Sequence, residues 1–417
     1  MPTARIAIVG GGAAGMMVAA TLLELECAAE IHLFEKNPSL GKKVIISGGG
    51  RCNVTTGITD TVVLNQKYIR GQKFLRAALA AFPPDRVRAW FELHGVPLKI
   101  EDDNRVFPQS DKGEDIVAMF GRLFAQGKVT VHLGESILSL KKTGDDFDLV
   151  STKSSYQFDA VVLTTGGNAY RHTGSTGDGY AFAQSCGHTV TTLGPSLNSF
   201  EAMDQWCKEL SGIALPQATL AYQGKRVEGP FLFTHFGITG PVTFAFSAHV
   251  AFEPITASQP LVVSLYPVGY ATFDQWEATL LGLMTTSPRK SLQTVLHTYL
   301  PKRVVLSLLA LARLDPSTEM HQLTKAGRHA LVHLFTGGLK ITLLSRRPGD
   351  EFVTAGGVPT TEVDYKTMAS KLCPGLYFGG ELLDVDGVTG GFNLQVAWAT
   401  GRIAGQALAK KYQLPSG

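Results

Sequence analysis

Arg5-Ile6-Ala7-Ile8-Val9-Gly10-Gly11-Gly12-Ala13-Ala14-Gly15 is the stretch that decides the fold of this chain. Its first five residues form an apolar run rich in β-branched side chains, which is typical of a strand buried on both faces. The glycines at positions 10, 12 and 15 follow the spacing G-x-G-x-x-G, and a helix is expected over residues 16–26. A second strand is predicted over residues 31–34, and Glu35 ends it. This order indicates a dinucleotide-binding unit rather than a glycine-rich turn of another α/β protein.

The glycines of this unit have separate physical roles. Gly10 permits the tight turn, Gly12 lets the backbone approach a pyrophosphate, and Gly15 lets helix and strand pack closely. The free N–H groups at the helix start carry roughly half a positive charge and bind phosphates, which makes Ala13 and Ala14 candidate contacts.

Glu35 can accept hydrogen bonds from ribose hydroxyls. An acid here favours the unphosphorylated ribose of FAD, because an NADP 2′-phosphate would meet like charge. The neighbouring Lys36 weakens that argument and is itself a candidate cofactor contact. A second G-x-G-x-x-G after a strand is not found, so a nicotinamide donor is left open rather than predicted.

The composition fits a cytoplasmic globular protein of two or three domains. The chain has 417 residues, of which 44% are hydrophobic and 18% charged, and its net charge of +3 is too small to argue for nucleic acid or an anionic membrane. The five cysteines are odd in number and lack C-x-x-C spacing, which fits a reducing compartment. The apolar start is interrupted by glycines and is interpreted as strand and helix rather than as a secretion signal. The sequence indicates no oligomeric state.

A second glycine-rich segment follows at residues 47–53. Three glycines flanked by Ser47 and Arg51 permit close backbone contact with a flat or anionic group, although a flexible surface turn is the alternative. Arg51 can pair with a phosphate or with a negative flavin edge. The candidate cofactor contacts here are Lys43, Ser47, Gly48, Gly50, Arg51, Cys52 and Asn53. Cys52 has no partner cysteine in sequence, so we expect a small buried residue or flavin neighbour, not a disulfide relay.

Further cofactor contacts are expected where later strands end. The backbone of Ile137 is a candidate for the adenine, and a buried strand over residues 160–165 ends in glycines, which makes Thr165, Gly166 and Gly167 candidates. Asp178 either caps the helix that follows it or meets the cofactor.

The end of the chain contains further candidate contacts for a nucleotide. Gly380 and Glu381 follow a short apolar strand at residues 376–378, and a helix of small residues is predicted from residue 391 to about residue 410. The start of that helix can face an anion or an electron-rich carbonyl. Its candidate contacts are Gly391, Phe392, Asn393 and Leu394.

The expected fold is α/β, with a discontinuous Rossmann-like domain formed by residues 1–190 and 354–417. Short alternating segments predict an inserted β-barrel-like domain from residues 191–270 and 336–353, and residues 271–335 are predicted to be mostly helical. Residues 67–93 and 111–124 are expected to be helices of the first domain. His329 and His333 are four residues apart and could lie on one face of a helix, but they are not part of an H-E-x-x-H motif, so no metal is predicted.

These motifs resemble those of FAD proteins of the glutathione reductase type. Three stretches, 41–53, 233–241 and 389–395, resemble more narrowly the bacterial BaiN/YhiN-like flavoproteins, sometimes labelled the aminoacetone oxidase family. The resemblance covers nearly the whole chain. It implies noncovalent FAD and a three-part architecture, whereas activities associated with the family range from amine oxidation to reduction of a conjugated steroid ketone.

The predicted function is an FAD-dependent oxidoreductase acting on a small organic substrate. The alternatives are a flavoenzyme acting on RNA, which the low net charge disfavours, and a non-enzymatic flavin sensor or electron-transfer protein. His235 lies in a tight loop and is followed by Gly237 and Gly240. It is the candidate acid/base, because histidine titrates near neutral pH. The alternative is that His235 only orders the loop. Tyr170 and Arg171 are candidates for holding the substrate.

Overall fold

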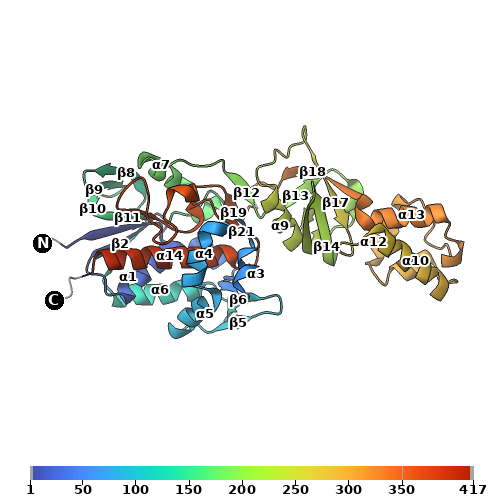
Figure 1. Cartoon of the computed structure of the whole chain (residues 1–417), viewed down its shortest axis with the longest axis horizontal. Coiled ribbons are helices and arrows are strands. Elements are labelled where there is room, and N and C mark those ends of the chain that lie inside the picture. The colour runs from blue at the N-terminus through green and yellow to red at the C-terminus, as the bar shows by residue number, and fades with distance from the viewer. Residues whose placement is uncertain (1–2, 350, 414–417) are drawn as a thin grey trace. The chain divides into compact units, whose positions relative to one another are not determined.

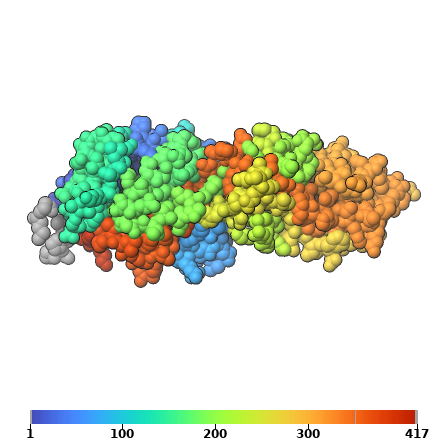
Figure 2. All heavy atoms as spheres, turned by 90° about the horizontal axis from the view of Figure 1, so that it is seen from above, coloured from blue at the N-terminus to red at the C-terminus, as the bar shows by residue number. Residues whose placement is uncertain are grey.

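The computed structural model describes residues 3–349 and 351–413. The chain divides into two compact units, one formed by Met1–Pro195 with Phe352–Gly417 and the other by Ser196–Glu351. Each unit is described by itself (Figure 1). Blue, green and orange-red atoms occur together in the first unit in Figure 2, because both ends of the chain build it.

The first unit is built on a five-stranded sheet with the order β20-β11-β1-β2-β7. Its strands are β1 (Arg5–Val9), β2 (Glu30–Glu35), β7 (Val129–Leu133), β11 (Ala160–Leu163) and β20 (Leu376–Phe378). All four pairings are parallel. The central strand is buried on both faces, as its apolar run predicts. The Rossmann-like fold class is therefore confirmed.

The order of the sheet reverses at β1, since the next strand in sequence, β2, lies on one side of it and β11 lies on the other. Ligands of open parallel sheets bind outside the carboxyl ends of the strands at such a reversal. Backbone bonds continue the sheet into this edge, from Gly10 N to Phe34 O at 2.9 Å and from Thr164 N to Val9 O at 2.9 Å. The edge of the sheet is thus ordered up to the glycines.

Helices α1 (Ala13–Glu24) and α14 (Phe392–Lys411) pack together on this sheet (Figure 1). Small residues allow the contact. A Cβ added to Gly401 would lie 2.5 Å from the carbonyl oxygen of Ala14, so the two backbones touch directly there. The first and last helices of the chain form one layer.

The remaining elements of the first unit surround this layer. They include α2 (Lys42–Ile46), β3 (Thr55–Thr56), α3 (Thr61–Asn65), β4 (Tyr68–Arg70), α4 (Gln72–Ala81), α5 (Pro84–Leu93), β5 (Leu98–Ile100), β6 (Arg105–Pro108), α6 (Glu114–Gln126), β8 (Ile137–Thr143), β9 (Asp146–Ser151), β10 (Ser155–Phe158), α7 (Asp178–Ser185), β19 (Val353–Ala355) and β21 (Asp386–Gly387). The single helix expected over residues 67–93 is wrong. A short strand comes first, and the chain forms two helices, since α4 ends at Ala81 and α5 begins at Pro84. Proline lacks an N–H and restricts the residue before it, so Pro83 and Pro84 prevent a continuous helix.

The second unit contains a closed six-stranded barrel with the order β13-β16-β15-β14-β17-β18. Its elements are β13 (Phe200–Ala202), α8 (Gln205–Glu209), β14 (Ala214–Tyr222), β15 (Lys225–Phe233), β16 (Gly237–Thr239), α9 (Pro241–His249), β17 (Leu261–Tyr266) and β18 (Leu339–Arg346). Four α-helices lie between β17 and β18, namely α10 (Phe273–Thr286), α11 (Leu292–Leu296), α12 (Lys302–Leu311) and α13 (Lys325–His333). The barrel and the helical region agree with the predicted fold class. The three domain boundaries given above stay a proposal.

The hydrophobic cores of the two units are separate clusters of buried side chains. In the second unit, one cluster contains buried side chains of both the barrel and the helical region, and within that region the ring centres of Trp276 and Phe335 lie 4.2 Å apart. Over residues 3–349 and 351–413, no helix is both long and apolar enough to cross a bilayer.

The contact between α1 and α14 can be tested at Gly401. Gly401→Ala should destabilise the protein by about 1–3 kcal/mol, because the added methyl group meets backbone rather than a movable side chain. Gly282→Ala on α10 is the matched control, since a Cβ there meets nothing within 4 Å and alanine favours a helix. Thermal unfolding should therefore show a lower Tm for the first variant and an unchanged or higher Tm for the second; equal Tm values would contradict the packing argument.

Candidate functional site

The candidate site lies in the first unit, where four strands of the parallel sheet end in glycines or acids. Gly10–Gly15 follows β1, Glu35 ends β2, Thr165-Gly166-Gly167 follows β11, and Gly380-Glu381 follows β20. A Cβ on Gly15 would lie 2.0 Å from the carbonyl oxygen of Gly10, so the turn and the helix are in direct contact. Ala13 and Ala14 are buried in the first turn of α1.

The Glu35 carboxylate is held rigidly at the end of β2. Its Oε1 accepts hydrogen bonds from Asn37 N at 2.8 Å and Asn37 Nδ2 at 2.7 Å, and its Oε2 accepts one from Gly11 N at 3.0 Å. A carboxylate offers about four acceptor positions, so one remains on Oε2. The side chain therefore keeps capacity for a ribose hydroxyl.

Lys36 and Asp178 lie together beside this end of the sheet. Lys36 Nζ lies 2.6 Å from Asp178 Oδ2 and 2.5 Å from Thr176 Oγ1. Burial alone would raise the pKa of Asp178, but hydrogen bonds from Lys36 and Thr176 lower it below its usual value. Asp178 is the first residue of α7, and its side chain forms no cap there, so of its two expected roles the capping role is wrong.

Glu381 links the ends of β11 and β20. It accepts a hydrogen bond from Lys43 Nζ at 2.7 Å and another from the Thr354 backbone N–H at 2.9 Å. A Cβ on Gly167 would lie 2.7 Å from Glu381 Oε1. Gly380 N donates to Thr400 Oγ1 on α14 at 2.9 Å. The predicted residues Lys43, Gly167, Gly380 and Glu381 are thus brought together.

The sequence interpretation did not include Thr354 or Thr400. Thr354 Oγ1 also accepts a hydrogen bond from Asn168 N at 2.7 Å, which holds the loop after Gly167. Both threonines support predicted residues across large sequence separations. A lone threonine in a strand or a helix gives no local signal of such a role.

The loop at residues 47–53 has three consecutive glycines with positive φ, from 59° at Gly48 to 88° at Gly50. Residues with side chains rarely adopt this conformation, so the glycines are required by the turn. Ser47 Oγ donates to Val44 O at 2.8 Å, and Asn53 Oδ1 accepts from Val106 N at 3.3 Å. The loop is therefore an ordered structure rather than the flexible turn considered above.

Cys52 and Arg51 in this loop are both engaged by the protein. Burial raises the pKa of the fully buried Cys52 thiol to about 12, which does not suit a nucleophile. Arg51 Nη1 lies 2.7 Å from Glu101 Oε1 and 3.2 Å from Asp111 Oδ1, and its guanidinium lies 3.7 Å from the centre of the Phe107 ring. Glu101 and Asp111 therefore already pair with Arg51. The cofactor contact predicted for Arg51 stays a prediction.

The start of α14 is held from several sides. Asn393 uses its side-chain amide to donate to Gly387 O and to accept from Gly387 N, both at 2.9 Å. Phe392 is buried, and Leu394 packs partly buried against the core. Gly391 precedes the helix, and no side-chain cap is formed. The first N–H groups of a helix have no partner within it, so this end can receive an anion.

The other candidates have the following surroundings. Ile137 begins β8 in a separate three-stranded sheet, opposite Ser151. The Thr165 side chain lies against Gly179 of α7, and Gly166 lies against Ser175. The adenine contact of Ile137 and the cofactor contacts at 165 and 166 stay predictions.

The catalytic candidates are divided between the units. In the first unit, Tyr170 stacks on Phe352 with ring centres 5.3 Å apart, and Arg171 donates to the Asn168 side chain. In the second unit, His235 is exposed, and its ring lies 5.1 Å from that of Phe236. These roles stay predictions.

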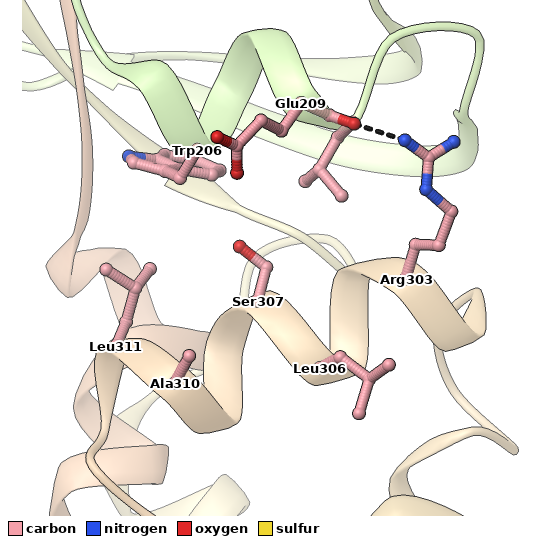
Figure 3. Close-up of a pocket in the computed structure, with 8 residues that line it drawn as sticks. Trp206, Glu209, Arg303, Leu306, Ser307, Ala310 and Leu311 are labelled. Carbon is pink, nitrogen blue, oxygen red and sulfur yellow. Dashed lines mark hydrogen bonds between the residues drawn. The ribbon is translucent and has the colours of Figure 1, made fainter.

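The second unit contains a groove of about 500 Å³ between α8 and α12 (Figure 3). Trp206 and Glu209 face Ser307, Ala310 and Leu311 across it, and Arg303 donates to the Glu209 backbone carbonyl. None of the predicted cofactor contacts line this groove, so we do not assign the cofactor to it.

His329 on α13 lies 3.5 Å from Glu277, and the described residues contain no cluster of three metal-binding side chains.

The glycine cradle fits a bound dinucleotide. A Cβ on Gly12 would meet nothing within 4 Å, so open space lies above the start of α1, although the same addition at Gly15 would meet backbone. This is the arrangement in which the middle glycine admits a pyrophosphate. Gly10, Gly12, Gly15 and Glu35 are the residues that would hold it.

Comparison with known proteins agrees with this site. The family model described as "HI0933-like protein Rossmann domain" matches residues 4–407. The chain belongs to the HI0933-like family.

Three similar proteins illustrate the range of the family and of the fold. A 3-dehydro-bile acid delta(4,6)-reductase of Clostridium scindens is 29% identical over 98% of this chain and 99% of its own. A ribosomal RNA dihydrouridine synthase of Escherichia coli is 30% identical over 96% of this chain and 97% of its own. A 3-ketosteroid delta1-dehydrogenase of Sterolibacterium denitrificans shares the fold at 13% identity, with a TM-score of 0.52 over 99% of this chain and 100% of its own.

The family match and the glycine cradle agree with the predicted FAD-dependent oxidoreductase. The resemblance stated from the motifs is confirmed, and so is the cofactor.

The cradle gives a direct test of FAD binding. Gly12→Val should leave this HI0933-like protein folded, because Gly12 has extended backbone angles and space for a side chain, but the isopropyl group would occupy the pyrophosphate position and bound FAD should be lost. Gly121→Val, at an exposed position of α6 with equal free space, is the matched control. Flavin absorbance and Tm of the purified variants measure both effects. Full FAD occupancy in Gly12→Val would refute the assignment of this cradle.

Proposed function

We propose that this protein reduces a carbon–carbon double bond conjugated to a carbonyl group. The observation that carries this proposal is the chemistry shared by two full-length relatives of different name. A delta(4,6)-reductase of a 3-oxo steroid and an enzyme that forms dihydrouridine both saturate a double bond in conjugation with a carbonyl. Reduction is therefore preferred to amine oxidation.

The reaction adds a hydride equivalent to the carbon β to the carbonyl and a proton to the α carbon. When bound, FAD supplies the two electrons, with NADH or NADPH proposed as their source. The chain must then hold the cofactor, stabilise negative charge and deliver one proton. The glycine cradle serves the first task, and the uncapped start of α14 is suited to the second.

The favoured substrate class is a small conjugated ketone. The bile acid reductase supports it over nearly the full length of both chains, and the small net charge of +3 does not favour a polyanion. The second candidate is uridine in RNA. The 30% identity to the E. coli dihydrouridine synthase over 406 residues favours it specifically.

Two half-reactions test these proposals. FAD in the purified protein should be reduced by NADH or NADPH in anaerobic stopped-flow experiments, and a steroid enone should then reoxidise it with formation of the saturated ketone. In a parallel arm, unmodified ribosomal RNA is incubated with the reduced protein and searched by mass spectrometry for uridines that gained two hydrogens. Product in the first arm alone supports the small substrate, and product in the second alone supports RNA. If neither oxidises the flavin faster than a saturated ketone, the proposed reaction is wrong.

The acid role of His235 has its own test. His235→Ala should slow the oxidative half-reaction roughly 10²-fold or more, the contribution typical of general acid catalysis. His329→Ala is the control, since His329 is a histidine of the same unit whose side chain is 43% exposed. FAD content and Tm are measured first; an unchanged rate would leave His235 without a role in proton transfer.

A further inference from the structure

His32 of β2 and His132 of β7 share a hydrogen bond within the first unit. His32 Nδ1 lies 3.0 Å from His132 Nε2, and the two rings are stacked with their centres 5.3 Å apart. The two side chains are 12% and 15% exposed. One ring donates the shared proton and the other accepts it, so the bond exists only while at least one of the two imidazoles is neutral.

The other side of His132 faces a buried carboxylate. His132 Nδ1 lies 3.2 Å from Glu135 Oε2, and the Glu135 side chain is 3% exposed. Glu135 Oε1 accepts hydrogen bonds from Ser151 Oγ at 2.5 Å and from the Tyr156 hydroxyl at 2.9 Å, and Lys153 Nζ lies 3.9 Å from Oε2. Burial alone would raise the pKa of Glu135, but these hydrogen bonds and His132 lower it below its usual value. The charged carboxylate therefore keeps a proton on Nδ1 of His132.

The groups around His32 disfavour a second proton on the pair. Burial lowers the pKa of His32, and positive charge on Arg5 and His132 lowers it further, whereas the Glu30 carboxylate acts in the opposite direction. Glu30 Oε2 lies 3.7 Å from His32 Nε2, but it is shared with Arg5 Nε at 3.4 Å. An unfolded chain would protonate this histidine near about pH 6.5. The stability that neutral His32 contributes is therefore complete above that pH and is lost as the pH falls below it.

The loop after β7 connects the histidine pair to the end of β2. Gly134 N donates to Asn37 O at 2.8 Å, and Glu135 N donates to Glu35 O at 3.1 Å. Asn37 in turn holds the Glu35 carboxylate through its backbone N–H and its side-chain amide. Glu135 thus contacts His132 with its side chain and Glu35 with its backbone. A displacement of β7 at the pair would reach the predicted ribose contact through these bonds.

We propose that the His32–His132 pair makes FAD binding by this protein sensitive to acid. A second proton would remove the hydrogen bond between β2 and β7 and would leave two positive rings 5.3 Å apart in partly buried surroundings. The end of β2 would then lose support, and Glu35 would lose its fixed position. Because FAD binds best to the intact arrangement, protons and FAD oppose each other's binding. The inference uses the predicted contact of Glu35 with FAD, but it does not depend on the substrate or the reaction.

The dissociation constant of FAD tests the proposal. FAD-loaded protein is diluted at a series of pH values between about 8 and 5, and released FAD is followed by its fluorescence. For the wild type, the dissociation constant should rise by up to about tenfold per pH unit below about pH 6.5, the limit for uptake of one proton. His32→Asn places an amide nitrogen near the position of Nδ1, so it can still bond His132 but takes up no proton. Its dissociation constant should change about threefold or less over the same range.

His94→Asn is the matched control. His94 directly follows α5, and its ring contacts Trp90 O at 2.7 Å and Glu24 at 3.6 Å rather than a second histidine. This variant should keep the wild-type pH dependence of FAD binding. If His32→Asn yields no FAD-loaded protein, His132→Gln makes the same test, since its amide nitrogen lies near the position of Nε2.

Two results would overturn the proposal. One is the same rise of the dissociation constant in acid for the wild type and for the variant of the pair. The other comes from Tm values measured at the same pH values. If the variant lowers the acid dependence of Tm but leaves that of FAD binding unchanged, the pair acts on stability alone and its coupling to the cofactor is wrong.

Discussion

The close approach of the first and last helices is the constraint on which the first unit depends. At Gly401 and Ala14 the two backbones meet without an intervening side chain. This contact places the middle of α14 against the first turn of α1, which follows the glycine turn after β1, and Gly380 N after β20 donates to Thr400 Oγ1 of the same helix. The nucleotide site is therefore assembled from segments that are almost 400 residues apart in the chain.

Charge is distributed over this site in pairs. Lys36 is balanced by Asp178, Lys43 by Glu381, Arg51 by Glu101 and Asp111, and Arg70 by Asp386. These contacts join segments that are distant in sequence, so each positive side chain of this set has an acidic partner. Removing one partner of a buried ion pair destabilises the folded protein, because the remaining charge is buried without compensation.

The parts of the site that depend on local pattern could be predicted from the sequence. Gly10, Gly12, Gly15 and Glu35 follow from a spacing within one βαβ unit, and the parallel sheet follows from apolar runs. The ion-pair partners and the supporting Thr354 and Thr400 could not be predicted, because they depend on contacts between distant segments. The break at Pro83 was missed because the apolar spacing continues on both sides of the two prolines.

The construction of the first unit from both chain ends has a consequence for biosynthesis. Residues 196–351 form a contiguous unit and are complete well before α14 leaves the ribosome. The inserted unit can therefore fold first, as domains do during synthesis, while the face of α1 that α14 covers stays open. The FAD site is completed last, so a chain shortened before residue 392 would contain a folded insertion but an unfinished host domain.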